Sequence, residues 1–160
     1  LVFLVDDDEL YLDTLEHNLR LDFKNGVKLE KFSTAEDCLK NIHRDPDIVL
    51  LDYYLPGSKK NMNGIEVLRK IKENKPDSEV VMLSGYNKLD IAVNCIRNGA
   101  YDYIVKNESA YMRAGNLVKN LLNTIQTRKE SRTHEKINWV VGVVMVMMVM
   151  YGVYFHLRYD

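Results

Sequence analysis

Purely apolar stretches alternate with stretches of helical spacing along the first 125 residues. The clearest apolar stretch is 48–51, Ile-Val-Leu-Leu, which predicts a strand buried on both faces of a parallel sheet. Residues 27–32 alternate between apolar and polar side chains, which indicates a strand nearer the sheet edge. The remaining predicted strands are 1–5, 79–83 and 103–105.

Apolar residues spaced three and four apart predict amphipathic helices after the strands. They are Leu12, Leu15 and Leu19; Ile65, Leu68 and Ile71; Leu89, Ala92 and Ile96; and Leu117, Leu121 and Ile125. A further helix is predicted to begin at Ser33, because Glu36 follows at capping-box spacing. Helix ends are predicted at Asn25-Gly26, Lys75-Pro76 and Asn98-Gly99. Alternating strands and helices predict an α/β fold: right-handed crossovers, a parallel sheet and helices on both faces.

Polar residues stand at the carboxyl ends of four predicted strands: Asp6 and Asp7, Asp52, Ser84, and Lys106. The carboxyl ends of parallel strands share one sheet edge, where ligands bind in such folds, so we expect these groups to converge. Three crowded carboxylates need a cation or raised pKa values, and Mg²⁺ prefers such oxygen ligands. A carboxylate nucleophile, Mg²⁺, an ammonium group and a hydroxyl are the parts required to phosphorylate an aspartate. A purely structural salt bridge between Lys106 and the acids is compatible with this prediction.

At these residues the sequence resembles a response-regulator receiver domain of two-component signalling, over about residues 1–125. The resemblance implies a flavodoxin-like (βα)5 sheet of strand order 2-1-3-4-5. It implies that a sensor histidine kinase or phosphotransfer protein phosphorylates Asp52, and that the chain only assists its own phosphorylation and dephosphorylation. The implied roles are Mg²⁺ binding by Asp6, Asp7, Asp52 and the backbone carbonyl of Tyr54; phosphate contacts by Lys106 and Ser84; and switching by Ser84 and Tyr103.

The sequence departs from the family pattern after Lys106, where Asn107 replaces the usual proline. A cis peptide before a non-proline residue costs about 2.5–4 kcal/mol, so we expect this bond to be trans. Tyr54 places a bulky side chain two residues beyond the predicted acceptor, and we hypothesise that it shields the acyl phosphate from water.

Two alternatives remain open. A haloacid-dehalogenase-type Mg²⁺ phosphatase would use Asp6 as its nucleophile, since Asp6 and Asp8 form Asp-x-Asp, but the acidic pair it needs after Lys106 is missing. A pseudo-receiver would only dock to a partner, against which the complete set of acids, serine and lysine argues. Phosphate on Asp52 or on Asp6 separates the receiver from the phosphatase.

The face between Ser84 and the last helix is the predicted output surface, whose partner is unknown. Its predicted contributors are Lys88, Arg97, Tyr101, Tyr103 and residues near Arg113. A net charge of −1 argues against a basic nucleic-acid-binding face, so no nucleic-acid partner is expected. Cys38 and Cys95 lack metal-site spacing, which favours small buried residues in a reducing compartment.

The C-terminal part is predicted to differ from the receiver domain at 1–125. Residues 126–136 are polar and form a linker or an extension of the last helix. Residues 137–157 are predicted to form a transmembrane helix, because a helix of that length spans roughly 30 Å and Trp139 and Tyr154 lie near its ends. Basic residues before this segment predict a single-pass protein of the cell membrane with a cytoplasmic receiver. A buried or dimer-forming helix is the alternative.

Overall fold

The computed structural model describes residues 1–24, 26–55 and 62–159, and the chain divides into two compact units, Leu1–Leu122 and Asn123–Asp160. The first unit contains a five-stranded sheet of order β2-β1-β3-β4-β5 in which every pairing is parallel. The strands are β1 (Val2–Val5), β2 (Leu29–Phe32), β3 (Ile48–Asp52), β4 (Glu79–Ser84) and β5 (Asp102–Val105). The predicted 2-1-3-4-5 order and the edge position of β2 are therefore confirmed.

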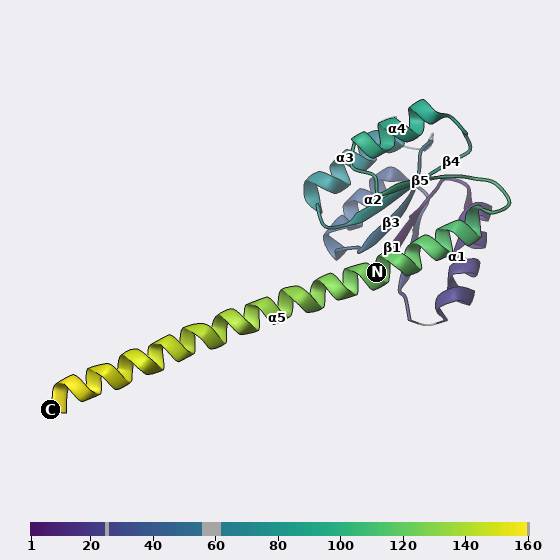
Figure 1. Cartoon of the computed structure of the whole chain (residues 1–160). Helices are drawn as coiled ribbons and strands as arrows, with labels where there is room; N and C mark the ends of the chain where they lie inside the picture. Colours follow the sequence, from purple (N-terminus) through teal and green to yellow (C-terminus); the bar gives the residue numbers. More distant parts are fainter. Residues whose placement is uncertain (25, 56–61, 160) are drawn as a thin grey trace. The chain divides into compact units, whose positions relative to one another are not determined.

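Helices connect the strands as the alternating pattern predicted (Figure 1). They are α1 (Glu9–Phe23), α2 (Ala35–Asn41), the 3-10 turn η1 (Ile42–Arg44), α3 (Gly64–Asn74), α4 (Leu89–Arg97) and α5 (Ala110–Tyr159). α3 begins with a complete capping box between Asn63 and Glu66, and it ends before Lys75 as predicted.

Two helix boundaries differ from the sequence prediction. The cap of α2 is Thr34, whose hydroxyl accepts the Asp37 N–H at 3.1 Å, so the predicted start at Ser33 is wrong by one residue. Both residues can cap a helix, and the backbone register decides which one does. α1 ends at Phe23, and Asn25 of the predicted stop lies outside the described residues.

The core lies on both faces of the sheet. Every residue of β1 and of β3 is buried, and the side chains of a strand alternate between the two faces. All five residues of β3 are buried, as the unbroken apolar run predicted. One face packs against α2, α3 and Cys95 of α4. Leu12, Leu15 and Leu19 of α1 are buried but lie outside that cluster. The helix α1 itself runs beside the first turns of α5 (Figure 1).

α4 shows that a helical pattern does not reveal which side is covered. Leu89 is 81% exposed and Ile96 is 48% exposed, whereas Cys95 is the buried residue of this helix. Both cysteines are free and buried, as predicted.

The predicted transmembrane helix at 137–157 is wrong. Across the part of the chain that the structure describes, no helix has an apolar stretch long enough to cross a bilayer. The predicted cell-membrane localisation is therefore wrong as well, and no long apolar C-terminal helix is found among the described residues.

Candidate functional site

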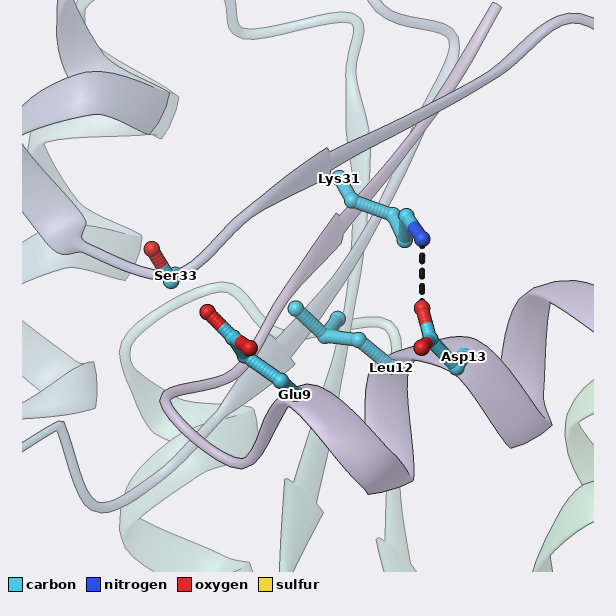
Figure 2. Close-up of a pocket in the computed structure, with 5 residues that line it drawn as sticks. All are labelled: Glu9, Leu12, Asp13, Lys31 and Ser33. Carbon is cyan, nitrogen blue, oxygen red and sulfur yellow. Dashed lines mark hydrogen bonds and ion pairs between the residues drawn. The ribbon is translucent and has the colours of Figure 1, made fainter.

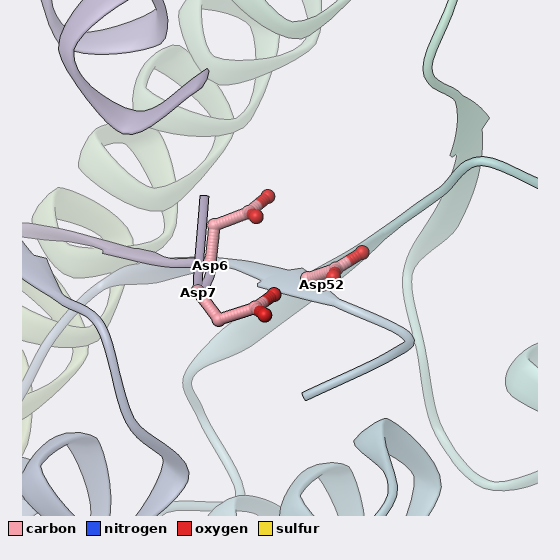
Figure 3. Close-up of side chains that lie close together, drawn as sticks. All are labelled: Asp6, Asp7 and Asp52. Carbon is pink, nitrogen blue, oxygen red and sulfur yellow. The ribbon is translucent and has the colours of Figure 1, made fainter. Parts of the chain in front are cut away.

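An acidic cluster lies where β1 and β3 end side by side. Val5 pairs with Leu51, so Asp6 comes level with Asp52, the last residue of β3. One carboxylate oxygen from each of Asp6, Asp7 and Asp52 lies within 4.8 Å of the others (Figure 3). Asp6 and Asp52 are buried, and Asp7 is exposed. The predicted convergence of these three residues is thus present.

Lys106 reaches the cluster from the end of β5. Its Nζ lies 2.6 Å from Asp6 Oδ2 and 3.0 Å from Asp52 Oδ1. Its backbone N–H donates to the Ser84 carbonyl at 2.7 Å, which ties the lysine to the neighbouring strand. The peptide bond before Asn107 is trans, as expected, and Lys106 reaches both acids in this arrangement.

The electrostatics of the site follow from burial and from the crowding of like charges. Burial, followed by the charge of Asp6, raises the pKa of Asp52 to about 6, although Lys106 acts in the opposite direction. Burial also raises the pKa of Asp6. Burial opposes the charge of Lys106, but hydrogen bonding and ion pairing with the two acids outweigh it and raise the lysine pKa. The ammonium group therefore stays charged and only partly relieves the repulsion between the acids.

A glycine allows α3 to begin against the end of β3. The Gly64 N–H donates to the Tyr53 carbonyl at 2.9 Å. A Cβ at this position would lie 2.7 Å from the Asp52 carbonyl oxygen, too close for any other residue. The Tyr54 side chain is 61% exposed. The Pro56-Gly57 turn of the sequence lies outside the described residues.

Ser84 and Tyr103 are linked through the loop after β4. The Ser84 hydroxyl is buried and accepts the Tyr86 N–H at 3.1 Å. The Tyr103 hydroxyl donates to the Tyr86 carbonyl, and its ring packs against the core cluster. Burial raises the pKa of Tyr103, while a hydrogen bond with Ser84 opposes that rise. The two predicted switch residues are therefore neighbours.

Sequence reasoning missed Tyr11. The Lys106 Nζ lies 4.5 Å from the centre of its ring, and the ring packs against Tyr111 of α5 at 5.1 Å between centroids. The only signal in the sequence is its position: Tyr11 lies four residues before Leu15, beside the buried stripe of α1.

A separate pocket of about 240 Å³ lies between α1 and β2, lined by Glu9, Leu12, Asp13, Lys31 and Ser33 (Figure 2). Lys31 is held there by Asp13 at 2.6 Å and by Glu16 at 2.8 Å. This pocket contains none of the predicted site residues.

The chemistry of the acidic cluster suits Mg²⁺. Its candidate ligands are carboxylate oxygens, which hard divalent cations prefer, and the exposed Asp7 leaves the cluster open to water. Burial and then the charge of Asp6 raise the Asp52 pKa, and a bound cation would relieve the second of these effects.

The chain matches known proteins in both sequence and structure. Residues 2–113 match the family model of the response regulator receiver domain. The DNA-binding transcriptional regulator NtrC of Proteus hauseri is 34% identical over 106 residues, which make up 66% of this chain and 21% of that protein. The nitrogen assimilation regulatory protein NtrX of Azorhizobium caulinodans is 34% identical over 130 residues, 81% of this chain and 28% of that protein.

Solved structures agree in fold. The receiver domain of NtrX from Brucella abortus has a TM-score of 0.68 at 31% identity, covering 78% of this chain and 99% of that one. A CheY-like receiver domain protein from Methanospirillum hungatei has a TM-score of 0.66 at 27% identity, covering 79% and 96%. Against the curated relatives above, the chain spans only 21% and 28% of their length.

Proposed function

The chain belongs to the response regulator receiver domain family, and on that premise we propose that Asp52 accepts a phosphoryl group from a sensor histidine kinase or a phosphotransfer protein. The observation that carries this proposal is the position of Lys106, whose Nζ lies within 3.0 Å of the Asp52 carboxylate at the open sheet edge. Family members are phospho-acceptors, and aspartate phosphorylation is their general mechanism. The assignment of that role to Asp52 is our proposal.

In the transfer, an Asp52 carboxylate oxygen attacks the phosphorus of a phosphohistidine. The new P–O bond forms as the P–N bond breaks, and the histidine nitrogen leaves with the bonding electron pair. Asp6, Asp7, Asp52 and the Tyr54 carbonyl would hold Mg²⁺, which when bound neutralises charge on the phosphoryl oxygens. Lys106 is placed to exchange its contact with Asp52 for a contact with the phosphoryl group.

We propose that Ser84 transmits the phosphorylation of Asp52 to the loop after β4. Its hydroxyl accepts a hydrogen bond from the Tyr86 N–H and also bonds to the Tyr103 hydroxyl, and we propose that its proton turns to the new phosphate. Moving toward the phosphate strains the Tyr86 contact, and the Tyr86 carbonyl also holds the Tyr103 hydroxyl. We infer that Tyr103 changes position together with this loop.

The output surface then lies over α4 and β5. Leu89, Ile96 and Tyr101 expose apolar area there, beside Lys88 and Arg97. This mixed surface suits a protein partner, which stays unidentified. The expectation that no nucleic acid is involved has no support, since one relative is named as a DNA-binding regulator. The predicted membrane partner is not retained.

The proposal is tested by labelling the protein with a small acyl phosphate such as acetyl phosphate in the presence of Mg²⁺, followed by peptide mapping of the acyl phosphate. We expect one label, on Asp52, that does not form when chelator is present from the start or in Asp52→Asn. Glu73→Gln, an exposed carboxylate on α3, is the matched control and should label normally. A label on Asp6 would establish the phosphatase instead, and an unlabelled wild type would indicate the pseudo-receiver.

A further inference from the structure

Three groups surround the Lys106 ammonium, and only two of them are acids. Asp6 and Asp52 lie at 2.6 and 3.0 Å, and the ring of Tyr11 lies at 4.5 Å from Nζ to centroid. A cation within about 6 Å of an aromatic face is attracted by the negative face of the ring, more strongly where water is excluded. The lysine side chain is only 19% exposed, so this attraction acts in a largely dry site.

The Tyr11 ring is held by its surroundings on both α1 and α5. Its backbone N–H donates to the Asp8 side chain, which caps α1 directly after the acidic pair. Its ring packs against Tyr111 with an interplanar angle of 33°. Farther along the same two helices, Gly115 leaves room for the Asp22 carboxylate, so α1 and α5 approach closely.

The hydroxyl of Tyr11 makes no hydrogen bond within the described part of the chain that would account for a tyrosine at this position. It is buried and has no hydrogen-bond partner among the described residues. Burial, the neighbouring Tyr111 and the two acids raise the pKa of the phenol, so it stays neutral. The ring contacts the ammonium as an aromatic face, and a phenylalanine ring would do the same.

We propose that Tyr11 is a positioning residue for phosphoryl transfer, which holds the Lys106 ammonium against the Asp52 carboxylate through its aromatic face. This inference rests on the proposed function. Without the ring, the flexible four-carbon side chain of the lysine occupies more conformations, and fewer of them place the ammonium beside the acceptor. Because Tyr11 does not touch the reacting atoms, its removal slows the transfer without abolishing it.

Three substitutions separate this role from ordinary packing. Tyr11→Leu removes the aromatic face and should lower the rate of Asp52 labelling by acetyl phosphate about fivefold to tenfold, from the usual strength of such contacts. Tyr11→Phe retains the face and should restore the rate to within twofold. Leu19→Val disturbs the buried packing of α1 two turns farther along and should also leave the rate within twofold of wild type.

A spectroscopic measurement tests the contact without any phosphorylation. Protons above an aromatic face move upfield, so the Lys106 Cε protons in NMR spectra of wild type and Tyr11→Phe should lie upfield of those in Tyr11→Leu. Equal shifts in all three proteins would overturn the contact. A rate in Tyr11→Leu equal to wild type, or a loss in Tyr11→Phe as large as in Tyr11→Leu, would overturn the positioning role. A wild-type chain that carries no label on Asp52 would refute the proposed function instead.

Discussion

Replacing Asp52 with asparagine should stabilise the protein, although it removes an ion pair. In the metal-free protein the buried Asp52 carboxylate lies beside Asp6, and its pKa is about 6 against an ordinary 3.8. A raised carboxyl pKa means that the fold disfavours the charged form. Asparagine keeps the shape of the side chain and carries no charge.

The pKa shift gives the size and direction of the effect. About two pKa units at 1.36 kcal/mol each make the ionised Asp52 cost the fold about 3 kcal/mol at pH 7, with the attraction of Lys106 already included. Between about pH 4 and pH 6 the folded wild type binds more protons than the unfolded chain, so its free energy of unfolding falls as pH rises. Asp52→Asn lacks this part of the decline.

Urea unfolding in the presence of chelator, at several pH values from about 4 to 7, measures both quantities. Asp52→Asn should exceed wild type by about 2–3 kcal/mol at pH 7, and the difference should shrink toward pH 4. Glu73→Gln, an exposed carboxylate on α3, should track wild type throughout. Equal stabilities of wild type and Asp52→Asn at pH 7 would refute the electrostatic reasoning, and so would a difference that grows toward low pH.

Four further predictions concern Mg²⁺ binding, the cap of α2, Tyr54 after the phosphorylated aspartate, and the start of α3. The affinity for Mg²⁺, measured by calorimetry, should weaken about tenfold for each pH unit below 6, because Asp52 must lose its proton before it can bind the metal. An affinity that does not change with pH would contradict this prediction. Thr34→Ala should lower the free energy of unfolding by about 1 kcal/mol, with Ser33→Ala within about 0.5 kcal/mol of wild type. Tyr54→Ala should speed loss of the phosphoryl group, and an unchanged rate would remove its shielding role. Gly64→Ala should cost about 1–3 kcal/mol in urea unfolding, because the added methyl meets backbone; a neutral result would mean that the α3 start shifts freely.

The sequence predicted the elements of the sheet because its strands bury both faces or alternate clearly. The apolar run at 48–51 and the alternation at 27–32 were sufficient to distinguish the central strand from the edge strand, whereas the strand order came from the family resemblance. The convergence of Asp6, Asp52 and Lys106 followed from their positions at strand ends, since parallel strands place those ends together.

What the sequence did not reveal depends on contacts between distant segments. Tyr11 and Tyr111 are a hundred positions apart, and nothing in either local pattern indicates that their rings pack together. The exposure of Leu89 follows from where α4 lies on the sheet, which its own periodicity does not specify. The predicted transmembrane helix at 137–157 was based on an uncharged stretch of sequence, and no helix among the described residues has the length and apolar character needed to cross a membrane.

Trp139 has a practical consequence for experiments. It is the chain's single tryptophan, it is 72% exposed, and it belongs to the unit Asn123–Asp160, while ten tyrosines are spread along the chain. Light at the red edge of protein absorption excites tryptophan and spares tyrosine, so the emission reports the surroundings of one known position. A shift of that emission to shorter wavelength on adding a candidate partner would show that the partner covers the surroundings of Trp139. The measurement uses the unmodified protein and needs no attached dye.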